Sequence, residues 1–504
     1  MHKTDKKLAS NTVFRFLDWL FITLPSFFYW VLAGKTLSIV YYGIVSTSVN
    51  LGMTFSGISL FGFNVTLWKL LPEYFERKEK DKARELTIFS IKAVIFSNIV
   101  FALAILIPSS FLSQIVKIPV DVIFITVITM LILSLWVMFE AVLIGKQEMK
   151  KIAITDLVGG ITRLVLSAVL IFLGFSYFGP LIGLMLGTLT IVLLRIPPDL
   201  FERIKKGVLN KKEIFFKFSF PAFISSLAWT IFLFGQYVLL SAIQNPEVTS
   251  IFTVAMLLTS PIVTIPNILS SALFPIISQL SVNRNSKWKQ GQLIKMVFRY
   301  SLFVAIPVSI FLLLFSNQII LLFSSAEFLT ASQLFPVLCL ASLIYGCAII
   351  FSQSLYSLGR PKLQRNIILM TVILFFILSI PLTMIYSALG MCIAYLISVT
   401  FIFLLCYINI RKIFMVELPL QDIKKILIAG LIIFVFLYTI ADWATHIFLA
   451  IAFCLVAGVL YLTILLLLKF YAKEDILFVR SIVEKLPILK KQLLKLVDFF
   501  SRFI

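Results

Sequence analysis

Residues 364–410 read QRNIILMTVILFFILSIPLTMIYSALGMCIAYLISVTFIFLLCYINI, two long apolar runs that meet at a short turn. An α-helix needs about 20 consecutive apolar residues to cross the hydrocarbon core of a bilayer. Residues 364–385 and 387–410 each reach that length. The stretch therefore predicts two consecutive membrane-spanning helices.

The same pattern covers almost the whole chain, which is 61% hydrophobic and has a mean hydropathy of +1.06. These values lie far outside the range of soluble proteins. The sequence predicts an all-α polytopic membrane protein with about 14 transmembrane helices. The apolar segments are 12–33, 38–64, 86–107, 120–144, 152–174, 179–198, 214–242, 248–280, 293–322, 329–358, 364–385, 387–410, 424–441 and 444–468.

The 44 Lys and Arg residues are distributed unevenly between these segments. Most lie at the N-terminus, in every second gap and in the C-terminal tail, whereas the alternate gaps contain only Lys35 and Lys117. Because cytoplasmic loops are enriched in Lys and Arg, we expect a multi-pass protein of the cell membrane with both termini in the cytoplasm. The net charge of +21 then reflects topology and attraction to anionic membrane lipids, and it does not indicate nucleic-acid binding.

Several classes of function find no support in the sequence. The N-terminal MHKTDKK leads into a full-length span, unlike a cleavable signal peptide. The five cysteines fall in apolar spans without a CxxC pair, and there are only two histidines, so we expect no metal site. The sequence contains no Walker-type phosphate loop, and the acids of the outer gaps are not clustered. We therefore predict neither an enzyme nor a bound cofactor.

Segments one to six and seven to twelve resemble two copies of one unit. The matching motifs are FRF at 14–16 with FKF at 216–218, GKQEMKK from Gly145 with GRPKLQR from Gly359, and SYFGPLIG with YSALGMCI, which pairs Gly179 with Gly390. Because each copy has an even number of helices, the two share one orientation, as in a parallel pseudo-twofold repeat. The predicted parts are an N-terminal six-helix lobe at 1–212, a C-terminal six-helix lobe at 213–412, two additional helices at 413–470 and a cytoplasmic amphipathic tail at 471–504.

Local motifs refine this plan. Gly179, Gly183 and Gly187 have the GxxxG spacing that lets helices approach closely, and we expect close packing inside one bundle. The segment 248–280 contains three prolines, which interrupt its ladder of backbone hydrogen bonds. Residues 69–85 alternate in charge sign and predict a surface helix.

Charged residues inside the apolar segments are the main functional candidates, because a charge in the bilayer core is costly. Arg163 lies about eleven residues into its segment, roughly 16 Å deep at 1.5 Å per residue, where its side chain cannot easily reach the interface. We predict that Arg163 faces a polar cavity and contacts substrate; the alternative is a structural hydrogen bond to backbone carbonyls.

The remaining embedded charges lie closer to helix ends. Arg15 and Asp18 are three residues apart and can pair across one helical turn. Glu140 and Asp156 are candidates for carrying a proton or binding a cation, with solvation at the interface as the alternative. For four basic residues near the cytoplasmic edge, snorkelling of the side chain to the interface is a sufficient explanation. These residues are Lys92, Arg195, Lys295 and Arg299.

The chain resembles the polysaccharide transporter (Wzx-like oligosaccharide flippase) family of the multidrug/oligosaccharidyl-lipid/polysaccharide flippase superfamily over about residues 8–470. The motifs that carry the resemblance are Tyr42-Gly43 with GISLFGF, Leu71-Pro72-Glu73, AVLIGKQEMKK, SYFGPLIGLMLG and the long stretch from FSQSLYSLGRPKLQR to MCIAYLIS. One departure is Gly235-Gln236-Tyr237, since many relatives have an acid in the middle of this seventh helix. That departure puts an acid-dependent ion site on this helix in doubt.

The resemblance implies two six-helix lobes around a lumen and alternating access, coupled to a H⁺ or Na⁺ gradient in many members. It implies a lipid-linked oligosaccharide as cargo, moved from the cytoplasmic to the outer leaflet, with glycan polymerases or glycosyltransferases as candidate partners and a monomeric protein. The cationic lumen of the family maps here onto Arg163, Arg15 and Lys217, and the candidates for ion coupling are Asp18, Asp156 and Glu140.

Two alternatives within the same superfamily stay open. A MATE-like drug/cation antiporter would need embedded carboxylates in a lumen without excess cations, and Asp18 and Asp156 keep that possibility open. A lipid II-type flippase would also have 14 helices and a cationic lumen.

Overall fold

The computed structural model describes residues 2–197, 209–281, 287–414, 418–444 and 446–471. Within these ranges, the side chains of residues 2–16, 18 and 19, and of several residues in 272–281, fall outside the description. The predicted amphipathic tail at 471–504 lies almost entirely outside the described residues.

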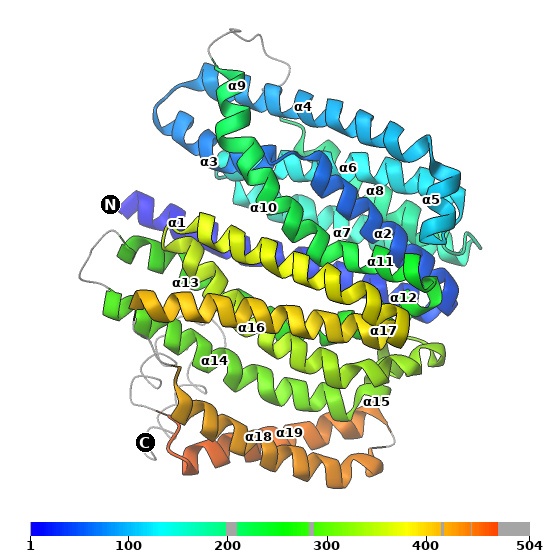
Figure 1. Cartoon of the computed structure of the whole chain (residues 1–504), viewed down its shortest axis with the longest axis vertical. Helices are drawn as coiled ribbons and strands as arrows, with labels where there is room; N and C mark the ends of the chain where they lie inside the picture. Colours follow the sequence, from blue (N-terminus) through cyan, green and yellow to red (C-terminus); the bar gives the residue numbers. More distant parts are fainter. Residues whose placement is uncertain (1, 198–208, 282–286, 415–417, 445, 472–504) are drawn as a thin grey trace. The chain divides into compact units, whose positions relative to one another are not determined.

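Helices alone build the described part of the chain (Figure 1). The first eight are α1 (His2–Thr36), α2 (Ile39–Ser59), α3 (Phe63–Glu76), α4 (Lys80–Leu106), α5 (Ser109–Val116), α6 (Val120–Gly145), α7 (Met149–Phe172) and α8 (Phe178–Arg195). The next elements are α9 (Lys211–Ile214), η2 (Phe215–Ser219), α10 (Phe220–Thr230), η3 (Ile231–Gly235), α11 (Gln236–Ile243), α12 (Pro246–Thr259) and α13 (Pro261–Ser281). The last are α14 (Lys287–Leu314), α15 (Ser316–Phe323), η5 (Ala326–Leu334), α16 (Phe335–Ser357), α17 (Pro361–Phe414), α18 (Leu420–Ile440), η6 (Ala441–Trp443) and α19 (Ile447–Leu467).

The prediction of an all-α polytopic membrane protein is confirmed. Among the described residues, 10 helices are long and apolar enough to cross a membrane, or up to 12 if the bent pairs α2–α3 and α12–α13 each form one span. The count of 14 stays a prediction. One reason for the lower number is that α17 counts once although it contains a break.

The break in α17 falls at Ser387, which has φ 53° and ψ −134°. This is the turn expected between the predicted segments 364–385 and 387–410. A Cβ atom on Gly390 would lie 1.9 Å from the carbonyl oxygen of Leu382, so only glycine fits where the two arms meet. The 54-residue element is thus two helices joined by a sharp turn.

The turn between α7 and α8, residues 173–177, is longer but shares two features with this break. Ser176 has φ 48°, and Gly179 lies three residues later, as Gly390 does after Ser387. A Cβ atom on Gly179 would lie 2.9 Å from the backbone nitrogen of Ile171, eight residues earlier, just as Leu382 precedes Gly390 by eight residues. The predicted equivalence of Gly179 and Gly390 therefore extends to backbone geometry, which supports the internal repeat.

The second predicted equivalence, of the motifs from Gly145 and Gly359, stays a prediction. Gln147 and Gly359 both have a positive φ, and each donates its backbone nitrogen to the carbonyl three residues earlier, that of Ile144 and of Tyr356. Lys78 and Gly174 end their helices in the same way, so this geometry does not identify the counterpart of Gly359.

Breaks also shape the second and eighth predicted spans. The axes of α2 and α3 differ by 52°, and Gly62, with φ 72°, lies at their junction. The chain breaks again at Ser260, directly before the first of the three prolines of the eighth segment. The predicted surface helix at 69–85 is wrong as a single element, because α3 ends at Glu76 and α4 begins at Lys80.

The described chain packs as two compact units. Unit 1 consists of 1–257, 323–334 and 365–398, and unit 2 of 258–322, 335–364 and 399–504. These units are groups of packed helices, so the lobe boundaries read from the sequence, at 212 and 412, stay a prediction.

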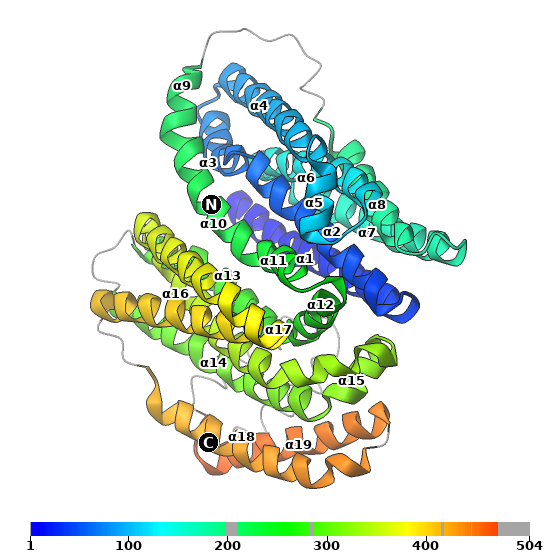
Figure 2. The same cartoon turned by 45° about the vertical axis from the view of Figure 1, so that its right-hand side comes forward.

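In unit 2, α18 and α19 lie side by side (Figures 1 and 2) and pack against α14. Arg299 on α14 forms an ion pair with Asp422 on α18, with 3.4 Å between Nε and the carboxylate. The guanidinium also lies over the ring of Phe470, 4.2 Å from its centroid. Arg299 therefore ties the two additional helices to α14, which is a more specific role than the predicted snorkelling.

Candidate functional site

The site is built on α1, α7 and α8 of unit 1, and close contact between α7 and α8 positions its residues. Cβ atoms on Gly183 and Gly187 would lie 2.7 Å from the nitrogen of Ser167 and 2.8 Å from the Cα of Arg163, respectively. The glycines therefore face the backbone of α7 directly, which confirms the predicted close packing within one bundle.

We expect Gly183→Leu to lower the free energy of unfolding of the protein in detergent by about 1–3 kcal/mol or more, because the new side chain must force α7 and α8 apart. Gly458→Leu on α19 is the matched control, since nothing lies within 4 Å of a Cβ atom there. Thermal unfolding of both variants measures the difference. Equal stability of the two would contradict the close helix contact.

Arg163 extends from α7 to α1. One guanidinium nitrogen, Nη2, donates a hydrogen bond of 2.6 Å to the hydroxyl of Ser26, and the guanidinium carbon lies 5.4 Å from the centroid of the Tyr29 ring. The hydroxyl of Tyr29 donates in turn to the carbonyl of Pro180 on α8. Three helices therefore meet at this arginine.

The guanidinium group of Arg163 has a hydrogen-bond donor that is not used. Its side chain is half-buried, and its Nε is buried without a hydrogen-bond partner. In the part of the chain that the structure describes, no carboxylate lies within ion-pair distance of Arg163. A buried donor without a partner is unfavourable, and an anionic ligand would satisfy it with a charge-assisted hydrogen bond.

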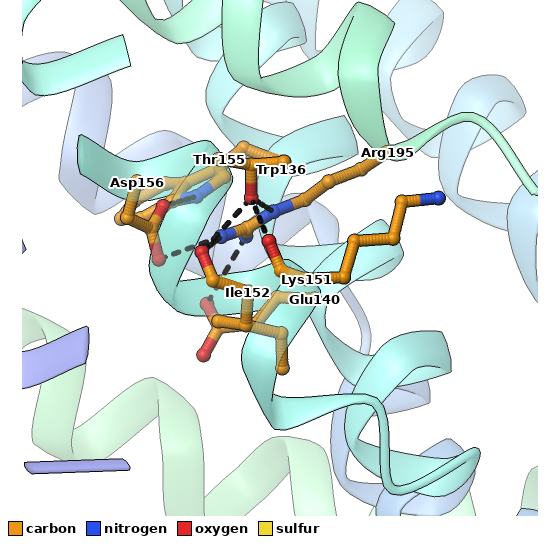
Figure 3. A network of polar contacts seen from close by, with 7 residues as sticks. All are labelled: Trp136, Glu140, Lys151, Ile152, Thr155, Asp156 and Arg195. Atoms are coloured by element: carbon orange, nitrogen blue, oxygen red, sulfur yellow. Dashed lines mark hydrogen bonds and ion pairs between the residues drawn. The ribbon is translucent and has the colours of Figure 1, made fainter. Parts of the chain in front are cut away.

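Arg195, the last residue of α8, has the opposite environment (Figure 3). Its side chain is fully buried, and Nη2 lies 2.6 Å from a carboxylate oxygen of Asp156 on α7. Nε donates to the hydroxyl of Thr155, and Nη2 also donates to the carbonyl of Ile152. The snorkelling predicted for Arg195 is therefore wrong, because the guanidinium is held inside the bundle by a carboxylate.

The two predicted acids of this region surround the same arginine. Asp156 is 1% exposed, and the indole nitrogen of Trp136 on α6 donates to it over 3.4 Å. Glu140, also on α6, lies 4.0 Å from Nη1 of Arg195. The solvation at the interface considered for Asp156 does not occur, since its carboxylate is buried against Arg195. We call Arg195, Asp156 and Glu140 the arginine–carboxylate cluster.

The other predicted site residues lie apart from this cluster or outside the description. Lys217 is in η2, exposed, and pairs at 3.2 Å with Glu213 of α9, four residues earlier in the chain. Arg15 and Asp18 belong to α1, but their side chains are outside the described residues, so their predicted pairing and roles stay predictions. The structure therefore brings Glu140 and Asp156 together around Arg195, for which the sequence analysis had taken snorkelling as a sufficient explanation.

Solved structures with a similar fold are membrane transporters. A lipid II flippase MurJ in an inward closed conformation has a TM-score of 0.73 at 17% identity, covering 90% of this chain and 98% of the other. A multidrug resistance MATE family transporter of the MOP superfamily has a TM-score of 0.62 at 13% identity, with 78% and 95% covered. A Vibrio cholerae MATE transporter has a TM-score of 0.59 at 13% identity, with 82% and 97% covered.

At these identities the likeness concerns the fold, which is that of the transporters of the MOP superfamily. No curated protein sequence matches the chain. Residues 8–281, more than half of the chain, match the model of the family described as "Polysaccharide biosynthesis protein". With its many apolar helices, this multi-pass membrane protein therefore belongs to the polysaccharide biosynthesis protein family.

Proposed function

We propose that the protein is a flippase that moves a lipid-linked oligosaccharide from the cytoplasmic to the outer leaflet by alternating access. The family match supports a role in polysaccharide biosynthesis, and the fold of MOP-superfamily transporters supports transport as that role. We also propose the cell membrane as its location and cytoplasmic termini, which the distribution of Lys and Arg supports.

One observation carries the proposal: Arg163 is an embedded cation without a described carboxylate partner and with an unpaired Nε. A lipid-linked glycan carries its sugar on a phosphate or diphosphate, which accepts charge-assisted hydrogen bonds from arginine. Arg163 would bind that phosphate while the protein changes conformation. Arg15 and Lys217 are proposed as further cations along the path, and Arg163 is the one whose surroundings favour the role.

Export of an organic cation is less well supported, because it would need an available buried carboxylate. The buried acid Asp156 is neutralised by Arg195 at 2.6 Å. A lipid II-type cargo is a second candidate, favoured by the likeness in fold to a lipid II flippase. This cargo is also a lipid diphosphate that carries sugars, so Arg163 would bind its phosphate in the same way.

The proposal also includes coupling to a H⁺ or Na⁺ gradient, with Asp18, Asp156 and Glu140 as candidate groups. Glycan polymerases or glycosyltransferases are proposed partners, and membrane lipids surround what we propose to be a monomer. Of the three acids, Glu140 is more accessible than Asp156, with a side chain 18% exposed against none.

Reconstitution into lipid vesicles tests the function directly. We expect vesicles with the full-length protein to expose a fluorescent lipid-linked oligosaccharide to an outer-leaflet glycan-binding protein faster than protein-free vesicles do. Vesicles loaded with a fluorescent organic cation should show no protein-dependent efflux under the same gradients. Efflux of the cation without movement of the glycan lipid would contradict the proposed flippase function and favour a drug exporter.

A further inference from the structure

A separate cavity opens in unit 1 between α3, the start of α4 and the turn from α6 to α7. Its volume is about 820 Å³, within the range of small-molecule sites. Its small residues Ala83, Thr87 and Gly145 are buried. A Cβ atom on Gly145 would lie 2.7 Å from the Cβ of Leu71, so α3 and α6 are in close contact beside the cavity.

Three basic side chains line the cavity. Lys80 and Arg84 belong to the first turns of α4, and Lys146 to the turn between α6 and α7. The three cations favour a phosphate group, which accepts charge-assisted hydrogen bonds from them.

The rest of the lining suits a sugar. Glu76, Gln147 and Glu148 supply oxygen atoms that can accept hydrogen bonds from hydroxyl groups. Phe75, which is 37% exposed, and Pro72 offer apolar surface beside them. A simple phospholipid phosphate would leave these acids without hydroxyl donors, whereas a phosphorylated sugar uses both the cations and the acceptors.

We infer that this cavity binds the phosphate–sugar headgroup of the lipid-linked cargo on the side that the basic gaps assign to the cytoplasm. The inference rests on the proposed function and adds a docking site distinct from Arg163. Both gaps that form the cavity, 65–85 and 145–151, belong to the basic set of the chain.

The test measures binding to the purified full-length protein in neutral detergent by isothermal calorimetry. The probes are a farnesyl diphosphate that carries N-acetylglucosamine, farnesyl diphosphate alone, and short-chain phosphatidic acid, whose headgroup has no sugar or glycerol hydroxyl. We expect the variant with Lys80→Gln, Arg84→Gln and Lys146→Gln to bind the sugar-bearing probe about tenfold or more weaker, since each basic group near a lipid phosphate contributes severalfold. The variant with Arg77→Gln, Lys78→Gln and Lys150→Gln loses the same charge outside the cavity and should bind like the wild type.

A second variant, Phe75→Ala with Glu76→Gln, keeps the three cations. It should reduce the preference for the sugar-bearing probe over farnesyl diphosphate, and elution at the wild-type volume in gel filtration shows that it is folded. Unchanged binding by the triple variant, or equally tight cavity-dependent binding of phosphatidic acid, would overturn the docking site. Failure of the proposed function looks different, because the wild type itself would then not bind the sugar-bearing probe.

Discussion

Arg163→Ala should reduce the rate at which lipid-linked oligosaccharide reaches the outer leaflet by about 10–100-fold. The substitution removes a charge-assisted hydrogen bond to the cargo phosphate, worth about 1.5–3 kcal/mol, and each 1.4 kcal/mol corresponds to about tenfold in rate. Arg163→Lys should retain part of the activity, since it keeps the charge but loses the planar donor geometry. The assay is the vesicle experiment with the fluorescent glycan lipid.

The control for this prediction is Lys92→Ala. Lys92 is another cation within a predicted span of unit 1, but its side chain is exposed, so its removal should leave transport within about twofold of the wild type. Thermal unfolding must show that Arg163→Ala is folded, because the residue also bonds Ser26. If the folded Arg163→Ala variant transports the glycan lipid at the full rate, Arg163 does not bind the cargo along the proposed path.

Asp156→Ala should destabilise the protein by about 3–5 kcal/mol, the cost of leaving a buried charge without its partner. The substitution leaves the guanidinium of Arg195 fully buried, with Glu140 4.0 Å away as a weaker counter-charge. The double variant Asp156→Leu with Arg195→Met should recover most of the loss, because apolar residues of similar size replace the pair. Unfolding by denaturant in mild detergent gives the three free energies.

The exposed pair of Lys217 and Glu213 is the comparison for this experiment. Lys217→Gln should change the free energy of unfolding by less than about 1 kcal/mol, because solvent screens an exposed ion pair. If Asp156→Ala is no more damaging than Lys217→Gln, the arginine–carboxylate cluster does not stabilise unit 1.

The sequence predicted the helical fold well, because the length and polarity of a membrane-spanning segment leave a strong signal. It also predicted close helix packing at Gly183 and Gly187 inside one bundle, because glycines four residues apart allow backbone contact. The sequence did not identify α7 as the helix that they contact. The turn residues with a positive φ were harder to predict, because Lys78, Lys117 and Gln147 adopt it although it is rare for residues other than glycine, asparagine and aspartate.

The arginine–carboxylate cluster was missed because each residue was judged by its distance from its own helix end. A better signal was available: Asp156 and Arg195 are almost equally far, in residues, from the turn at 173–177, so a helical hairpin places them at the same depth. Which faces of α7 and α8 meet depends on tertiary packing, and the contact of Glu140 on α6 with the same arginine has no sequence signature.

The turns at Ser176 and Ser387 have a consequence for membrane topology. Both serines have a positive φ, and each is followed three residues later by a glycine that lies against the residue eight positions before it. In the predicted parallel repeat, these turns are equivalent and lie on the same side of the membrane. Each predicted copy then begins and ends on one side, so the second copy needs no inversion relative to the first.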